Sequence, residues 1–282
     1  MFFPIEIVPL LCYKPPMITL MKRIVLLFVP MIFMVCSCSN NPKSQEENPG
    51  NDQEKNKALV APNTLTEAEI DGGWQLLFDG KTTGGWRGFK SDRFPQKGWY
   101  VTDGTLMIEY SGTGEQGFAG DIISKQQFSD FDLKLEWKIS KGGNSGILLY
   151  VTENDDYEAT WHTAHEIQVL DDFGYDDVHD YVPTLRQVSG ALYDLYTPAS
   201  AEAGPVGKWN KARIRLEEGH LQHWLNDSLV TDVQLWTDEW ESRVAKSKFN
   251  VYPDFGIARK GHIGLQDHGQ QVWYRNIRVL EL

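Results

Sequence analysis

From Trp74 onward, hydrophobic residues recur at every second position in short runs. Gly, Asp and Asn separate the runs at intervals of about ten residues. A period of two is typical of β-strands that bury one face, and the separating residues favour tight turns. The pattern predicts about ten to twelve strands. Examples are "WYVTDGTLMIEY", "FDLKLEWKI", "SGILLYV", "HEIQVL" and "VWYRNIRVLEL".

Two short segments have helical character. Thr66 and Glu69 have the spacing of a capping box, which marks the start of a helix. Residues 237–246 begin with acidic residues and carry Arg243 and Lys246 near their end, as the helix dipole favours. The sequence therefore predicts an all-β fold, a β-sandwich of antiparallel sheets with one or two short helices.

The alternation also predicts which side chains face the core. In "HEIQVL", Ile167 and Val169 point inward, so Glu166 and Gln168 point outward. In "FDLKLEWKI", Glu136 lies on the outward face by the same argument. A glutamate is unremarkable on a convex, solvated face. A functional role requires the outer face of one sheet to curve into a groove.

Residues 1–38 are expected to be an N-terminal extension followed by an export signal. Two basic residues precede an apolar run and "VCSC", which resembles the bacterial lipoprotein box with Cys38 as the lipid anchor. A transmembrane helix is the alternative, but the uncharged run over residues 24–37 is short for a bilayer. Ser39, directly after the anchor, favours the outer membrane of a bacterial cell envelope. Whether the protein faces the periplasm or the cell surface is left open.

Residues 39–63 are predicted to be a disordered tether, because few large apolar residues offset the entropy of ordering them. Residues 64–282 form the folded domain. All three cysteines, Cys12, Cys36 and Cys38, precede it, so it carries no disulfide and no cysteine chemistry. The formal net charge of −12 repels nucleic acid, which is excluded as a partner.

Seven motifs, in order, resemble the 3-keto-disaccharide hydrolase family. They are "GWQLLFDGKTTGGW", "NSGILLYV", "EIQVLDD", "SGALYDLY", "GKWNKARIRLEEGHLQHWLND", "SKFNVYPDFG" and "GHIGLQDHGQQVWYRNIRVLEL". The resemblance covers the chain from about Leu65 to Leu282. It implies a concanavalin-like jelly roll, a carbohydrate substrate, and a groove lined by Glu136, Glu166 and Gln168.

The implied chemistry begins from a ketone at C3 of one sugar ring. The ketone acidifies the C2 proton, and the glycosidic oxygen at C1 can then be eliminated before water adds. Such a site needs a base, an electrophile for the enolate oxygen and an acid for the leaving alcohol. A conventional glycosidase needs two carboxyl groups that flank C1. Both routes require clustered acids.

Three residues are candidates for catalysis. Glu166, as acid or base, shares a face with Gln168, and two positions along a strand place their side chains about 7 Å apart, within reach of one sugar ring. Glu136 matches the family's "LEW" motif, although an ion pair with a nearby Lys or Arg is the alternative. His268 in "LQDHG" is a candidate acid, electrophile or metal ligand, and a hydrogen bond closing the turn is its alternative.

Further candidates for substrate binding are polar residues inside the same motifs. Asn144 and Asp171 flank predicted strands, where turn formation explains them equally well. Gln266 shares the strand parity of His268. Tyr193 and Lys248 are candidates for stacking or anion stabilisation, and Lys248 could instead neutralise the end of the preceding helix.

A metal ion and aromatic stacking both remain open. Carboxylates and His268 converging in a groove could hold Ca²⁺ or Mn²⁺, although no spacing motif for a metal is present. Trp99, Trp161 and Trp224 are candidates for stacking on sugar faces or for the core.

Three classes of function are compatible with these observations. The first is an exported enzyme that cleaves the glycosidic bond of 3-keto-glycosides. The second is a conventional, glucanase-like glycoside hydrolase. The third is a non-catalytic carbohydrate-binding module, since one fold serves binding proteins and enzymes equally well.

Overall fold

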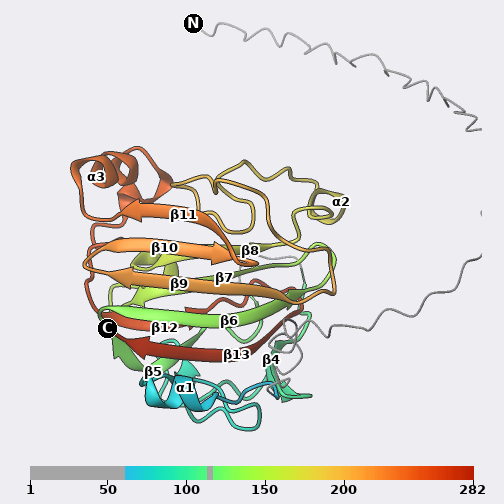
Figure 1. The fold of residues 1–282 in the computed structure, drawn as a ribbon. Coiled ribbons are helices and arrows are strands. Elements are labelled where there is room, and N and C mark those ends of the chain that lie inside the picture. The colour runs from blue at the N-terminus through green and yellow to red at the C-terminus, as the bar shows by residue number, and fades with distance from the viewer. Residues whose placement is uncertain (1–60, 113–116) are drawn as a thin grey trace, which may run out of the picture. The chain divides into compact units, whose positions relative to one another are not determined.

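The computed structural model describes residues 61–112 and 117–282 (Figure 1). The predicted signal over residues 1–38, its anchor Cys38 and most of the predicted tether lie outside the described residues. Asn63, assigned to the tether, is buried. Its backbone N–H donates to Asn276 Oδ1 at 2.6 Å, and its side chain donates to the carbonyl of Gly104 at 2.8 Å. The folded domain therefore already includes Asn63.

The larger of two sheets has eight strands, all paired antiparallel. Its order is β11-β10-β9-β6-β13-β4-β3, and the short strand β1 pairs with β13. The bounds are β1 Gln75–Leu76, β3 Trp99–Thr102, β4 Thr105–Ile108, β6 Phe131–Ile139, β9 Asn210–Glu217, β10 His220–Leu225, β11 Ser228–Gln234 and β13 Val272–Glu281.

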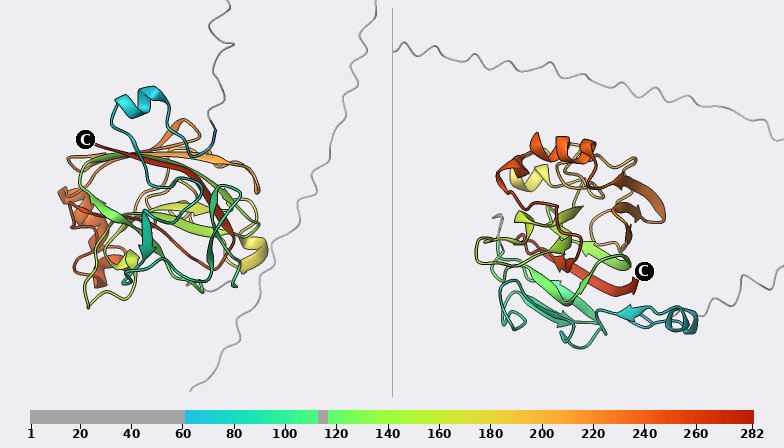
Figure 2. Two further views of the ribbon diagram at one scale, coloured as in Figure 1. Left: turned by 90° about the horizontal axis from the view of Figure 1, so that it is seen from below. Right: turned by 90° about the vertical axis from the view of Figure 1, so that its left-hand side faces the viewer.

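The smaller sheet has five antiparallel strands in the order β2-β5-β12-β7-β8. The bounds are β2 Trp86–Gly88, β5 Ile122–Phe128, β7 Asn144–Val151, β8 His165–Leu170 and β12 Gly261–Leu265. The two sheets form two layers, with α1 (Glu67–Asp71) outside the larger one (Figure 2). The predicted jelly-roll sandwich of two antiparallel sheets is confirmed.

Short helices decorate the sandwich. The predicted capping box forms at α1, where Thr66 and Glu69 bond each other's backbone N–H groups. The predicted second helix is α3 (Asp238–Ala245), capped by the side chain of Thr237. The remaining elements are the helix α2 (Asp176–His179) and the 3₁₀ turns η1 (Thr160–His162) and η2 (Lys248–Val251). No helix among the described residues is long and apolar enough to cross a membrane.

The core lies between the sheets and follows the predicted parity. In β6, Phe131, Leu133, Leu135 and Trp137 are buried, and in β8 the inward residues Ile167 and Val169 are fully buried. β8 is also buried on its outward face. A loop covers its outer edge, where the Tyr193 N–H donates to the carbonyl of Glu166 at 2.8 Å. The same loop places Tyr193 beside the outward residues of β8, so that they lie in a hollow and not on an open sheet face.

Candidate active site

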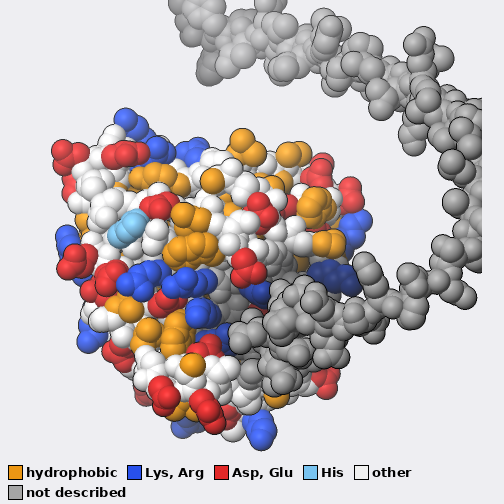
Figure 3. Space-filling model, in the orientation of Figure 1, with side chains coloured by type: hydrophobic (Ala, Val, Ile, Leu, Met, Phe, Trp, Pro, Cys, Tyr) orange, Lys and Arg blue, Asp and Glu red, His pale blue; other side chains and the backbone are white. Residues whose placement is uncertain are grey.

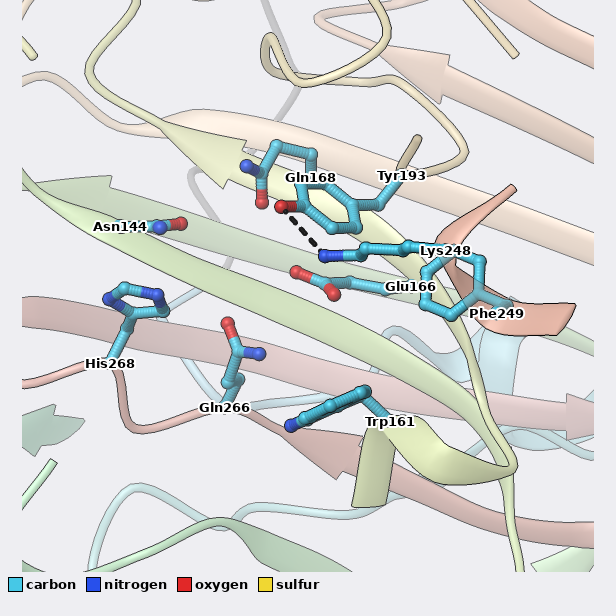
Figure 4. Close-up of a pocket in the computed structure, with 9 residues that line it drawn as sticks. All are labelled: Asn144, Trp161, Glu166, Gln168, Tyr193, Lys248, Phe249, Gln266 and His268. Carbon is cyan, nitrogen blue, oxygen red and sulfur yellow. Dashed lines mark hydrogen bonds between the residues drawn. The ribbon is translucent and has the colours of Figure 1, made fainter. Parts of the chain in front are cut away.

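A pocket of about 300 Å³ lies on the outer face of the smaller sheet. Strands β7 and β8 form its floor. Its walls are η1, η2, the loop that carries Tyr193 and the segment that follows β12. Figure 4 shows the lining side chains converging on one space. They are Asn144, Trp161, Glu166, Gln168, Tyr193, Lys248, Phe249, Gln266 and His268.

Glu166 and Gln168 reach the pocket because their parity in β8 is opposite to that of the core residues. The neighbouring strand makes room for them at Gly146, which pairs with Gln168. A Cβ atom at Gly146 would lie 2.6 Å from Glu166 Oε1, closer than such contacts allow. The glycine is therefore needed for the carboxyl group to lie across β7.

The opposite wall follows the end of β12. The Gln266 N–H donates to the carbonyl of Gly146 at 3.0 Å, and the carbonyl of Gln266 accepts from Ser145 Oγ at 2.6 Å. His268 lies two residues further along, across the pocket from Glu166 (Figure 4). Backbone bonds to β7 thus set the position of Gln266, and His268 follows it two residues later in the chain.

Lys248 and Tyr193 form the third side of the pocket. Lys248 Nζ donates to Tyr193 Oη at 3.2 Å and lies 4.4 Å from the centre of the Tyr193 ring (Figure 4). It also lies 6.0 Å from the centre of the Trp161 ring. The ammonium group therefore serves the pocket, and the alternative role of neutralising the end of α3 is not what the contacts show.

Burial dominates the electrostatics of Glu166. Its side chain is held in the pocket away from bulk water, and this desolvation raises the pKa of its carboxyl group to about 8. The ammonium of Lys248 opposes this rise in pKa, and the carboxylate of Asp121 adds to it. No hydrogen bond to the Glu166 carboxyl is found within the described part of the chain. At neutral pH, Glu166 is therefore largely a carboxylic acid and can donate a proton.

The raised pKa predicts a pH-dependent cost to stability. The folded protein holds the Glu166 proton more tightly than the unfolded chain, so the associated stability is complete below about pH 4.5 and is lost as pH rises through about 8. Glu166→Gln removes this loss. We expect its melting temperature to match the parent at pH 5 and to exceed it by roughly 5 °C or more at pH 9. Calorimetry at both pH values checks this, and a pH-independent difference would contradict it.

Three amide groups in the pocket hold acceptors without partners. Asn144 Oδ1, Gln168 Oε1 and Gln266 Oε1 are buried, and within residues 61–112 and 117–282 none accepts a hydrogen bond. Buried polar atoms are nearly always satisfied, because leaving one unpaired costs about 1–3 kcal/mol. A ligand rich in hydroxyl groups would satisfy all three.

Glu136 does not belong to this site, and its predicted place beside Glu166 is wrong. The parity argument for it was correct, but β6 lies in the larger sheet and its outward face is on the other side of the sandwich. There Glu136 Oε2 accepts from Arg275 Nε at 2.8 Å. Figure 3 views this face, where basic and hydrophobic side chains gather.

The face around Glu136 contains a larger hollow of about 540 Å³. Most of its charged groups are in ion pairs. Arg213 binds Asp132 at 2.6 Å, and Lys211 binds Asp227 at 3.1 Å. The guanidinium of Arg213 also covers the Trp224 ring at 4.7 Å, so the predicted stacking of Trp224 on a sugar is not supported. Size therefore does not identify the functional pocket here. The cluster of three unpaired amide acceptors, which only the smaller pocket contains, does.

Asp171 is a turn residue, and its predicted contact with substrate is not supported. Its Oδ2 accepts from the Gly142 N–H at 2.8 Å and its Oδ1 from the Phe173 N–H at 3.2 Å. The side chain is buried and does not line the pocket. Trp99, a candidate for stacking on a sugar, is likewise buried and is a core residue.

The pocket brings together most of the predicted site residues. They are Glu166, His268, Gln168, Asn144, Tyr193, Lys248 and Gln266. Trp161, considered as a stacking residue, lines it as well. Phe249 was missed, because nothing in the pattern around it distinguishes a pocket aromatic from a core one. No group of three or more His, Cys, Asp or Glu side chains suited to a metal ion occurs among the described residues.

The fold and the pocket define a class of protein: an all-β sandwich with a polar, aromatic-walled ligand site on the outer face of one sheet. Residues 73–280 match the model of the 3-keto-alpha-glucoside-1,2-lyase-like domain. The chain therefore belongs to this family, and it is an enzyme.

Two relatives illustrate the match. A 3-keto-disaccharide hydrolase from Bacteroides thetaiotaomicron is 38% identical over 277 residues, which cover 87% of this chain and 93% of that protein. A crystal structure from Parabacteroides distasonis, provisionally named a glycosyl hydrolase, superposes with a TM-score of 0.71 at 32% identity. The match covers 79% of this chain and all of that one.

Proposed function

We propose that this enzyme cleaves the glycosidic bond of 3-keto-disaccharides by acid–base chemistry. The observation that carries the proposal is the set of three unpaired amide oxygens, from Asn144, Gln168 and Gln266, around one protonated carboxyl group. Hydroxyl groups of a sugar ring fit these acceptors, and Trp161 offers an aromatic face. The hydrolase from Bacteroides thetaiotaomicron supports this choice of substrate.

In the proposed reaction, a base removes the C2 proton and the electron pair forms an enolate with the C3 ketone. The pair then returns to expel the oxygen at C1, leaving an enone, and addition of water at C1 completes net hydrolysis. His268 is the base, Lys248 stabilises the enolate oxygen, and Glu166 protonates the departing oxygen. The buried amides orient the ring.

The pocket does not support a conventional glycosidase equally well. That mechanism uses two carboxyl groups on either side of C1. Glu166 is the one carboxyl group among the described residues that line the pocket. Elimination needs a single carboxyl group together with a base and a cation, and the pocket provides candidates for both.

The decisive assay compares a disaccharide with its 3-keto form, each with and without a chelator. We expect free sugar and a transient enone absorbance from the keto form and no reaction with the parent disaccharide. Cleavage of the parent would instead indicate a conventional glycosidase. Binding without any turnover would indicate a binding module. A dependence on Ca²⁺ or Mn²⁺ would show as loss of activity with the chelator.

The proposal includes a location at the cell envelope, with lipid attachment at Cys38 and an outer-membrane anchor. It is supported by the sequence "VCSC" after a short apolar run. We expect Cys38→Ala to move the protein from the membrane fraction to the soluble fraction without loss of specific activity. An unchanged membrane fraction would contradict the anchor.

A further inference from the structure

A second hollow, of about 340 Å³, adjoins the first and has a similar size. The two share Trp161 and Gln266 in their linings, so these side chains form a common wall. The other sides of the second hollow come from the loop after β2, the segment before β5 and the residues leading into η1. Apart from the common wall and η1, it is thus built by segments that do not line the first pocket.

One carboxylate, that of Asp121, joins the two chain segments that carry the common wall. Asp121 Oδ1 accepts from the Asp267 N–H at 2.8 Å, and Asp121 Oδ2 accepts from Thr160 Oγ1. Asp267 follows Gln266 in the chain, and Thr160 precedes Trp161. Asp121 therefore links the segments that carry Trp161 and Gln266, in addition to the backbone bonds of Gln266 to β7.

The second hollow presents hydrogen-bonding groups to a ligand. Gln266 Oε1, in the common wall, is more than nine-tenths buried and has no partner within the described part of the chain. At the rim, the side chains of Arg93 and Glu158 are exposed, and the described residues offer neither a hydrogen bond nor an ion pair to them. These groups suit the hydroxyls of a neutral sugar. The carboxyl groups of Asp121 and Asp267 also line the hollow, with their oxygens bonded to protein donors, and they disfavour an anionic ring.

We propose that the second hollow binds the sugar ring that departs with the glycosidic oxygen, while the first pocket holds the 3-keto ring. This inference rests on the proposed function. Two hollows of similar size, separated by one wall, match two rings joined by one oxygen atom. The bond to be cleaved then lies over Trp161 and Gln266, between the two rings. The departing ring is a neutral hexose.

The test compares two substrates on the full-length protein. One is a 3-keto-disaccharide and the other is the methyl 3-keto-glucoside, whose aglycone cannot fill the second hollow. We expect the double variant Arg93→Ala/Glu158→Ala to raise KM for the disaccharide about 10-fold, because binding energy from the second ring is lost. KM for the methyl glucoside stays unchanged. Arg259→Ala, another exposed arginine, is the matched control and changes neither value.

Equal changes in KM for both substrates, or no change for either, would overturn the second subsite. Calorimetric titration of the unaltered protein and the double variant with both sugars gives the same comparison without turnover. A protein that binds both sugars but cleaves neither would contradict the proposed function alone. Loss of affinity confined to the disaccharide would then still support the subsite.

Discussion

Glu166→Gln is expected to lower kcat by about 10²–10⁴-fold, the usual contribution of a positioned general acid or base. Glutamine keeps the size of the side chain but cannot donate the proton that the departing oxygen needs. Binding should survive, because the variant keeps the amides of Asn144, Gln168 and Gln266 that we propose contact the ring. Steady-state kinetics with a 3-keto-disaccharide, together with calorimetric affinity, separates the two effects.

The pH dependence of the rate independently tests whether Glu166 is the general acid. Since burial raises the pKa of Glu166 to about 8, its acid form dominates at neutral pH. We expect kcat/KM to fall as pH rises through about 8, and this limb to disappear in Glu166→Gln. A rising limb would make Glu166 the base and exchange the roles proposed for it and His268.

The matched control for this experiment is Glu136→Gln. Glu136 belongs to the opposite sheet, where its carboxylate pairs with Arg275 at 2.8 Å. Removing it breaks a partly exposed ion pair, so activity should stay within twofold, while stability should fall by about 1 kcal/mol or less. Equal losses in both variants would show that the effect of Glu166→Gln is structural.

The outward direction of Glu166 and Gln168 could be predicted from the sequence because strand parity is a local property. Two positions along β8 return to the same face whatever the strand packs against. The same parity placed Glu136 correctly on an outward face. Parity does not say to which sheet a strand belongs, and in a sandwich the two outward faces are on opposite sides. That choice depends on pairing between distant strands, which the local pattern does not contain.

The walls of the pocket depend on longer-range geometry still. Its aromatic side chains come from three segments that lie about 30 to 60 residues apart in the chain: Trp161, Tyr193 and Phe249. The lengths of the connecting loops do not determine which of these side chains come into contact. Motif resemblance placed Tyr193 and Lys248 near the site without giving their contacts. Asp171 shows the converse, since an acid after a strand was read as a ligand or a turn former and both of its oxygens serve the turn.

Lys248→Met is expected to lower kcat/KM by about 10²-fold, the lower range for removing one group that stabilises an oxyanion. Methionine keeps the length of the side chain and its packing beside Tyr193 but removes the positive charge. Because the ammonium of Lys248 lowers the pKa of Glu166, its loss should also move the falling limb of the pH profile to higher pH. Rate measurements from pH 6 to 10 record both changes.

Lys246→Met provides the matched control, since Lys246 is exposed at the end of α3, two residues away in the chain and outside the pocket. If Lys248 acted only on the end of α3, both variants would have nearly normal rates, and the falling limb of the pH profile would stay at the same pH. If Lys248 acts at the enolate oxygen, Lys248→Met and Lys246→Met differ in both rate and pH profile. If Lys248→Met lowered the rate without moving the falling limb, the charge of Lys248 would not influence the pKa of Glu166, which would contradict the proposed electrostatic coupling between the two residues. The shift of the limb, which loss of packing alone would not produce, therefore distinguishes an electrostatic role from a structural one.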